Sequence, residues 1–194
     1  MKKLLISVVA IFIALTSLSQ TKIDFNKFNY SLLESKVIEQ INNYRVSIGL
    51  QSLFISKVMK TNISDVTSVM NANIDKGKHI DPNVYKKNQT IWGGVFSELF
   101  KATTGTISTE PPKLFWFALS GEIIAVVPQN NFGTYEEMSK QILTAWLNSP
   151  GHKAIIETPF VHISNIPGVI SCSVKKSKSN KFYVTANFAI LACM

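Results

Sequence analysis

Three side chains that lie far apart in the chain have the types needed for metal or acid–base chemistry. They are His79, Glu122 and His152. Two neutral imidazoles and one carboxylate, with a fourth position open, are the ligand set of many catalytic zinc sites. The chain has no His-Glu-x-x-His element that would place two ligands on one helical face. A metal site therefore requires a fold that brings distant segments together, and the alternative is a hydrogen-bonded polar cluster without a physiological metal.

His152 follows a predicted amphipathic helix. Thr134-Tyr135-Glu136-Glu137 is a capping box, which marks the start of this helix. Pro150 and Gly151 are expected to end it and to leave His152 on a turn. Ser149 then fits a helix-end or turn hydrogen-bonding role. A nucleophilic pair of Ser149 and His152 is disfavoured, because the Pro-Gly turn separates them and no orienting acid is evident. The apolar face of the helix consists of Tyr135, Met138, Ile142, Ala145 and Trp146, at helical spacing.

Two further helices are predicted in the first half of the chain. Ser31-Leu32-Leu33-Glu34 is a second capping box, and Gly49 ends the first of these helices. The second helix begins after Ser56, and Gly77 is expected as its left-handed C-terminal cap, two residues before His79. The apolar stripe of the first helix is Leu33, Val37, Ile41, Tyr44 and Ile48, and that of the second is Met59, Ile63, Val66, Met70 and Ile74.

The C-terminal part of the chain predicts an antiparallel hairpin. Residues 169–174 and 182–190 are rich in β-branched and aromatic types and flank a turn of Lys, Ser and Asn. Between the helices and this hairpin, residues 92–102 favour a short helix, whereas the apolar run 114–119 is too short to assign by periodicity. Three helices ahead of a hairpin indicate an α+β layered domain.

Cys172 and Cys193 are the only cysteines, and an exported chain could join them. A hairpin turn centred near Lys178 would place Cys172 opposite Val184, nine residues before Cys193. Along a straight strand those residues span roughly 30 Å, at about 3.3 Å per residue. A disulfide would therefore require the C-terminal tail to fold back.

Residues 1–19 have the pattern of a signal peptide, with Lys2 and Lys3 ahead of the apolar run 4–15. We expect one mature domain over 20–194, secreted or located in the periplasm or cell envelope. The apolar run is shorter than the roughly 20 residues that span a membrane, and no transmembrane segment is expected in the chain after the signal peptide is removed. The formal net charge of +8 falls to +6 without Lys2 and Lys3.

The basic charge of the mature chain comes almost entirely from lysine, since Arg45 is its only arginine. Arginine is the residue suited to bidentate contacts with phosphate and guanine, so nucleic acid is not expected as a partner. The lysines fit either a weakly attractive surface for an anionic envelope polymer or simple surface solubility.

Five segments, spread over nearly the whole mature chain, resemble known proteins when taken together. They are Asn43-Tyr44-Arg45 with Gly49-Leu50 and Leu53, Met70 with Gly77-Lys78-His79, Gly121-Glu122-Ile123, the stretch from Trp146 to Lys153, and the stretch from Phe182 to Phe188. In this order they resemble the CAP superfamily, whose SCP domain is found in cysteine-rich secretory, antigen 5 and pathogenesis-related-1 proteins, and in particular its exported bacterial branch. The stretch from Trp146 to Lys153 is the most specific match.

The resemblance implies a three-layer α-β-α sandwich with a small antiparallel sheet and a surface cleft carrying two histidines and two acidic residues. Carried over by position, the cleft residues are His79, Glu122 and His152, with His79 and His152 as ligands for zinc or another divalent cation. Ser149 stands where many eukaryotic members have glutamate, and Ile123 replaces the usual asparagine. The 42 residues between His79 and Glu122 exceed the usual family spacing.

A binding function through this cleft is the interpretation that these residues favour, with a protein, a lipid or an envelope component as ligand. The alternative is a metal-assisted hydrolase of peptide or ester bonds, in which Glu122 would be the candidate catalytic residue, as ligand or as general base. A lipid carrier is a third interpretation, and it would need an apolar groove, for which the run 114–119 is the one hint.

Overall fold

The predicted hairpin lies at the centre of a four-stranded sheet with the order β1-β3-β4-β2. The computed structural model describes residues 21–81, 83–86, 88–105, 115–129, 132–159 and 167–193. The elements are η1 (Phe25–Lys27), α2 (Tyr30–Ser47), β1 (Phe54–Ile55), α3 (Lys57–Met59), η2 (Lys60–Ser64), α4 (Asp65–Ile74), α5 (Asn83–Lys86), α6 (Gln89–Thr104), β2 (Phe115–Pro128), α7 (Tyr135–Leu147), α8 (Pro150–Ile156), β3 (Val169–Lys176) and β4 (Lys181–Cys193).

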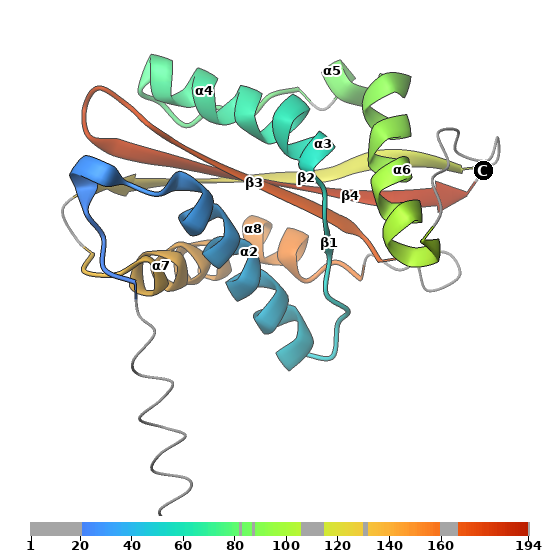
Figure 1. Cartoon of the computed structure of the whole chain (residues 1–194), viewed down its shortest axis with the longest axis horizontal. Coiled ribbons are helices and arrows are strands. Elements are labelled where there is room, and N and C mark those ends of the chain that lie inside the picture. The colour runs from blue at the N-terminus through green and yellow to red at the C-terminus, as the bar shows by residue number, and fades with distance from the viewer. Residues whose placement is uncertain are drawn as a thin grey trace, which may run out of the picture.

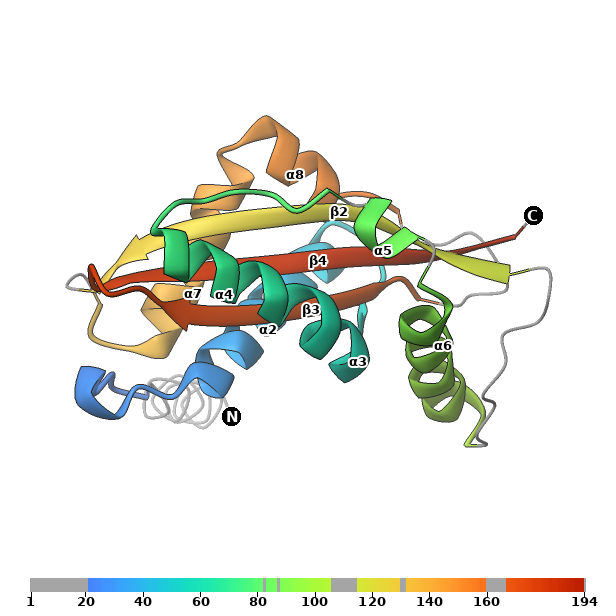
Figure 2. The ribbon, with the colours of Figure 1, turned by 90° about the horizontal axis from the view of Figure 1, so that it is seen from above.

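Helices cover both faces of the sheet, as Figures 1 and 2 show. On one face α3 and α4 lie along the strands, with α6 packed beside α3, and α2, α7 and α8 lie on the other face (Figures 1 and 2). Each face buries its own apolar cluster, one including Trp146, Ile123 and Phe188, and the other including Met59 and Val95. This arrangement confirms the α+β class and the three layers expected from the sequence.

The sheet is antiparallel apart from its shortest pairing. Strands β3 and β4 pair antiparallel, as do β2 and β4, while the two-residue β1 pairs parallel with β3. Strand β2 has 14 residues and includes Glu122, so the apolar run that periodicity left unassigned is the start of a long edge strand. The side chains of residues 115–120 lie outside the described part.

The first helix begins two residues earlier than its predicted capping box implied, because that box would have made Ser31 the N-cap. Asn29 is the N-cap of α2, and its side chain accepts a hydrogen bond from Leu32 N–H. Glu34 instead reaches across to β3, where it accepts from Val174 N–H at 3.1 Å. The predicted end is correct, because Gly49 follows the helix with φ of 81°. Of the predicted stripe, Leu33, Val37 and Ile41 are fully buried, whereas Ile48 is exposed.

The second helix begins after Ser56 as predicted, but its buried face changes partway along. Ser56 caps α3, and Met59 and Ile63 are buried. The π-helical turn η2 then adds a residue to one turn, which rotates the following residues around the helix axis. Val66 and Ile74 are therefore exposed, and the buried residues from Ser64 to the end of α4 are polar: Ser64, Thr67, Ser68 and Asn71.

The left-handed cap of this helix is Asp75, not Gly77 as predicted. Asp75 has φ of 50°, and its N–H donates to the Asn71 carbonyl. Its carboxylate accepts hydrogen bonds from Ser179 and Tyr183 in the hairpin, which explains why a residue other than glycine occupies the position. Gly77 packs over β2, where a Cβ atom would lie 3.7 Å from Val126 Cγ2.

The hairpin register differs from the one that the predicted turn centre implied, so Cys172 lies opposite Ala186 and not Val184. Cys172 is a buried free thiol, and burial raises its pKa well above the ordinary value. The Cys193 side chain lies outside the described part. The predicted signal peptide and His162, the third histidine of the chain, also lie outside it.

Candidate functional site

Glu122 is held by four hydrogen-bond partners. Its Oε1 accepts from Ile80 N–H at 3.1 Å and lies 3.2 Å from His79 Nδ1. Its Oε2 accepts from Thr67 Oγ1 at 2.8 Å and from Asn187 Nδ2 at 3.0 Å. The side chain is only 7% exposed. A carboxylate has about four lone-pair sites, so these partners occupy all of them.

The polar face of α4 continues this network into the sheet. Ser64 Oγ donates to Asn187 Oδ1 at 2.7 Å, which orients the Asn187 amide so that its nitrogen faces Glu122. Ser64 also lies 2.7 Å from Ser171 Oγ on β3. These groups are buried, and a buried polar group without a partner is costly. The network therefore fixes the position of Glu122 relative to both α4 and the sheet.

His79 lies on the segment that follows α4, and this segment is anchored beside it. Lys78 N–H donates to Asn71 Oδ1 at 2.8 Å, and Ile80 N–H donates to Glu122. The His79 side chain is 58% exposed. Because an ionised carboxylate can only accept, the His79 Nδ1 atom carries the proton in this contact. In the neutral ring, Nε2 is then the atom with a lone pair available for a ligand.

His152 lies in the first turn of α8 and not on a terminating turn as predicted. Pro150 is the first residue of α8, a position that suits proline because its missing N–H would have no partner there. His152 is half-buried, and burial lowers its pKa, with a smaller contribution from the positive charge of His79. The two imidazoles are therefore close enough to interact electrostatically. Ser149 is the N-cap residue of α8 and makes no capping side-chain bond.

These positions bear directly on the predicted zinc site. No group of three or more His, Cys, Asp or Glu side chains in the described part of the chain is placed to hold a metal ion. Glu122 could bind metal or act as a general base only by giving up existing donors. Two histidines remain as possible ligands, with Glu122 orienting one of them, as carboxylates often do for metal-binding histidines.

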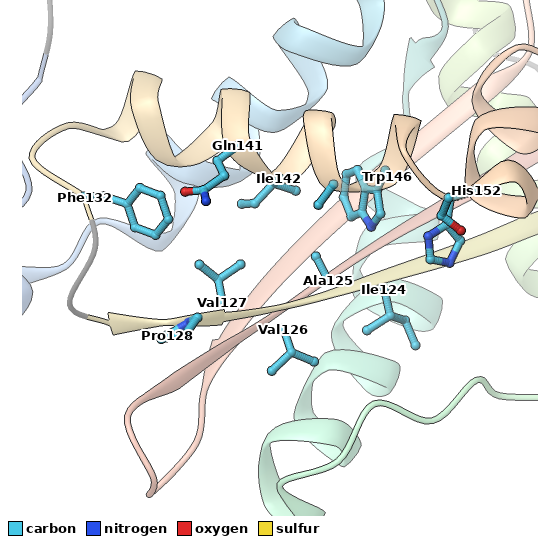
Figure 3. A pocket seen from close by; sticks show the side chains of 12 residues that line it. Ile124, Ala125, Val126, Val127, Pro128, Phe132, Gln141, Ile142, Trp146 and His152 are labelled. Atoms are coloured by element: carbon cyan, nitrogen blue, oxygen red, sulfur yellow. The ribbon is translucent and has the colours of Figure 1, made fainter.

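An apolar groove of about 340 Å³ adjoins His152 and runs between β2 and α7. Figure 3 shows side chains of both elements around it. Its lining includes Val127, Ile142, Trp146, Ser149 and His152. Trp146 is 1% exposed, so its predicted packing role is correct, but its indole nitrogen has no hydrogen-bond partner among the described residues. The run 114–119, which had hinted at a groove, has its side chains outside the described part.

Arg45 holds α8 against the end of α2. Its guanidinium donates to the carbonyl oxygens of Gln51 at 3.0 Å, Ile156 at 2.5 Å and Thr158 at 2.9 Å. Arg45 is 1% exposed, and burial lowers its pKa to about 10, so it stays charged at neutral pH. The arginine is thus a structural link and not part of a surface for anions.

Sequence reasoning missed the residues that position Glu122, above all Thr67, Asn187 and Ser64. A signal for them exists in the sequence. Ser64, Thr67, Ser68 and Asn71 recur at spacings of three, four and seven, which is typical of one polar helical face. In the predicted strands, Ser171 and Ser173, and Thr185 and Asn187, alternate with apolar residues, which indicates a matching polar face on the sheet.

Comparisons with known proteins identify a shared fold. No protein-family model and no curated protein matches the chain. Among solved structures, it is similar to an outer surface protein from Borrelia burgdorferi, with a TM-score of 0.53 and 16% identity. That match covers 88% of this chain and 98% of the other. At this identity the similarity shows the fold and does not extend to activity.

Two weaker matches are a cysteine-rich secretory protein from Staphylococcus aureus and an extracellular protein containing a SCP domain from Bacillus anthracis. Their TM-scores are 0.47 and 0.41, with 11% and 15% identity over 82% and 87% of this chain. This chain spans 39% and 44% of their respective lengths. With TM-scores below 0.5, neither match supports a conclusion about this protein.

Within the described residues, no helix is both long and apolar enough to cross a membrane.

Proposed function

We propose that this chain is an exported CAP-type binding protein that recognises a protein, a lipid or an envelope component through a cleft around His79, Glu122, Ser149 and His152. The family segments in the sequence and the layered fold support this proposal. The observation that carries it is the saturated carboxylate of Glu122, which presents an exposed, oriented imidazole at His79. A fixed imidazole beside a second, half-buried one is a recognition surface that needs no chemical step.

The same observation weighs against a hydrolase. A general base must have a lone pair free to take a proton from water. Both oxygens of Glu122 already accept hydrogen bonds, two of them from the buried residues Thr67 and Asn187. Breaking those bonds would leave buried donors without partners, at a cost of about 1–3 kcal/mol each. Orientation of His79 is therefore the role that the contacts of Glu122 favour.

A divalent metal in the cleft would have two protein ligands, both histidines. Imidazole is a common zinc ligand, and His79 and His152 each offer a nitrogen. When bound, zinc would supply a positive charge that attracts an anionic or carbonyl group of the ligand. The protein would contribute the orientation of His79 through Glu122.

Zinc titration of the EDTA-stripped protein separates binding from hydrolysis. We expect wild type to bind zinc at least tenfold more tightly than His79→Ala or His152→Ala, measured by isothermal titration calorimetry. Lys153→Ala is the matched control, because it changes a largely exposed residue of α8 next to His152 without removing an imidazole. Failure of wild type to bind zinc would remove the metal from the proposal and exclude the metal-assisted hydrolase.

Hydrolysis of peptides or esters by the protein would contradict the binding proposal. Wild type, with and without zinc, is incubated with a library of fluorogenic peptides and esters. We expect no turnover above that of the double variant His79→Ala/His152→Ala. Zinc-dependent turnover that is lost in Glu122→Gln would replace the binding function with hydrolysis.

A lipid ligand would need an apolar groove, and the groove beside His152 meets that requirement. Vesicles test this ligand, because binding of a membrane lipid would produce co-sedimentation with neutral phosphatidylcholine vesicles in moderate salt, which screens simple attraction by the lysines. Ala145→Glu, which adds charge at an exposed position of the groove lining, should abolish it. Wild type that stays in the supernatant would exclude membrane lipid as the ligand.

The proposed location is the cell surface or the extracellular space, after removal of residues 1–19. Mass spectrometry of the exported protein is expected to find a mature N-terminus near Gln20.

A further inference from the structure

The free edge of β2 carries backbone groups that have no partner in the described part of the chain. Among the strands of the described residues, β2 is the last of the sheet and pairs only with β4. Gln129 N–H donates to the Asn180 carbonyl at 3.1 Å, in the same register as the β2–β4 ladder. Because hydrogen-bonded pairs alternate in an antiparallel ladder, the odd-numbered residues 123–127 bond to β4. The N–H and C=O groups of Glu122, Ile124 and Val126 therefore point away from the sheet.

A second observation gives the same alternation. Ser177 N–H donates to the Lys181 carbonyl at 2.8 Å in the register of the β3–β4 pair. The odd-numbered residues of β4 therefore bond to β3, and its even-numbered residues bond to β2. Phe182, Val184 and Ala186 lie opposite Val127, Ala125 and Ile123, which again assigns the odd residues of β2 to the ladder. Among the described residues, no backbone group pairs with the outward backbone of 124 or 126.

Residues 123–127 of this edge lack the charges, prolines and bulges that protect sheet edges in many proteins. Natural edges are blunted by lysines, prolines, bulges or a covering element. Residues 123–127 read Ile-Ile-Ala-Val-Val, with no charge, and Pro128 comes only at the end. Val126 is 44% exposed. The one register irregularity of the β2–β4 pair lies before this stretch, between Leu119 and Gly121.

The edge opens into the apolar groove described above. The groove is lined by every residue from Ile124 to Pro128, so side chains of both sheet faces contribute and the groove follows the strand. On one side α7 contributes Ile142 and Trp146. On the other, Gly77 packs on Ile124 and Val126, and Figure 2 shows the segment between α4 and α5 running along β2.

We propose that the edge of β2 over 122–126 binds an extended peptide segment of a partner protein as an additional antiparallel strand. Backbone N–H and C=O groups at alternate residues are complementary to another backbone in extended conformation, a mode known as β-augmentation. Side chains of the peptide that face α7 enter the groove and are apolar. This inference rests on the proposed binding function and names its partner class.

The shape of the edge favours a single segment over a second copy of the chain. Figure 2 shows α8 reaching past β2, and α7 and α8 both contact this strand. A second whole sheet brought edge to edge would carry its own α7 and α8 to the same place. A single strand occupies only about 4.8 Å beside β2. A groove of about 340 Å³ is at the lower end of ligand-site volumes, which suits a few side chains.

The indole of Trp146 provides an additional attachment point in the groove. Its nitrogen is a buried donor without a partner among the described residues, and Figure 3 shows it directed towards β2. A side-chain oxygen of the incoming segment would satisfy this donor.

The probe is the acetylated, fluorescein-labelled peptide Thr-Val-Thr-Val-Thr-Val-Thr, and its affinity is measured by fluorescence anisotropy. The side chains of Ile124 and Val126 face the α4 side of the sheet, so peptide residues paired directly with them also face that side. With valines in the groove, the threonine N–H groups donate to β2. Methylation of the threonine nitrogens should weaken binding at least tenfold, whereas methylation of the valine nitrogens should change it less than threefold.

The variant Val126→Pro tests the contribution of the edge strand to peptide binding. Proline removes the outward N–H but no ladder hydrogen bond, which an edge strand tolerates. We expect at least tenfold weaker peptide binding at an unchanged melting temperature, while Val126→Thr, which keeps the N–H, binds within about twofold of wild type. If Val126→Pro does not fold, the methylated peptides on wild type remain decisive. Amide hydrogen exchange of Ile124 and Val126 should slow when the peptide is added.

Three results would overturn the inference. They are no binding of the peptide, equal binding of both methylated peptides, or a concentration-dependent dimer in sedimentation that protects the same amides without peptide. The last would assign the edge to a second copy of the chain. The protein could fail to bind the peptide and still bind zinc or vesicles in a way that depends on His79 and His152. That result would leave the proposed function intact and reject this partner.

Discussion

Glu122 has the residue type of a catalytic base but the contacts of an orienting group. One of its oxygens is used by two partners in the His79 segment, and the other by two buried side chains, Thr67 and Asn187. Hydrogen bonds from such donors stabilise the charge of a carboxylate that burial would otherwise disfavour. The contacts of this one residue therefore distinguish a site built for recognition from one built for proton transfer.

Glu122→Gln should destabilise the protein by about 1–3 kcal/mol, because one carboxylate oxygen becomes an amide nitrogen that faces donors. Urea denaturation of wild type and variant measures the free energy of unfolding. Glu39→Gln is the control, since the Glu39 side chain is 51% exposed and pairs with Lys36 at the surface. Equal stability of Glu122→Gln and wild type would mean that the four donors do not hold the carboxylate.

His152 should make the stability of the metal-free protein depend on pH. Its pKa is lowered in the folded state, first by burial and then by the charge of His79. Between this lowered value and about 6.5, the ordinary pKa of histidine, the unfolded chain binds more protons than the folded one. The contribution is therefore fully present above about pH 6.5 and is lost as the pH falls through the lowered pKa. His152→Asn should flatten this part of the urea midpoint curve.

His79→Ala separates the two causes of the lowered pKa. Removing the positive neighbour should raise the pKa of His152 towards its ordinary value, although burial would keep it below. NMR titration of the His152 ring protons in EDTA provides the measurement, with Lys78→Ala as control for a change of charge in the same segment. An unchanged His152 titration in His79→Ala would show that the two imidazoles do not interact.

At the scale of elements, the sequence predicts starts of helices better than their faces. The capping box of α7 forms as expected, with Thr134 Oγ1 accepting from Glu137 N–H and Glu137 accepting from Thr134 N–H. The stripe through Val66 and Ile74 fails because the π turn at 60–64 rotates α4, whereas the prediction assumed a regular helical period throughout. Pairing of His79 with Glu122 could be expected only from the family resemblance, because their separation along the chain says nothing of it.

Strand β2 packs closely against α8 at Gly121. A Cβ atom there would lie 2.7 Å from Ile155 Cγ2 and 3.0 Å from its Cδ1. Gly121→Ala should therefore destabilise the protein by about 1–3 kcal/mol and displace α8 together with His152. The melting temperature and the His152 NMR signals report the two effects.

Gly151→Ala is the matched control on α8, because nothing lies within 4 Å of a Cβ atom at that position. The double variant Gly121→Ala/Ile155→Ala should recover part of the lost stability, since it removes the atoms that clash. A Gly121→Ala variant as stable as wild type would show that α8 adjusts freely beside β2.

At the scale of the whole molecule, the layers could be predicted, whereas their connections could not. Helical periodicity followed by strand-like alternation is sufficient to predict the α+β class. The hairpin of β3 and β4 lies close to its predicted bounds. The length of β2 was hidden because an apolar run and a polar Glu122 belong to one strand. The role of Arg45 was hidden because a lone arginine in a basic chain gives no sign that it is buried.

Arg45 joins three parts of the molecule. It lies near the end of α2 and donates hydrogen bonds to carbonyls in the segment before β1 and at the end of α8. Arg45→Met should lose about 3 kcal/mol of unfolding free energy, since one buried and two partly buried carbonyls lose their donor, at about 1–3 kcal/mol for a buried one. Arg45→Lys keeps the charge but lacks the planar fork, so it should recover only part of the loss. Urea denaturation measures both, and Lys36→Met, at a partly exposed ion pair of α2, is the control. Because α8 carries His152, loss of zinc or ligand binding should accompany the loss of stability in Arg45→Met, and a fully stable Arg45→Met protein would contradict the proposed link.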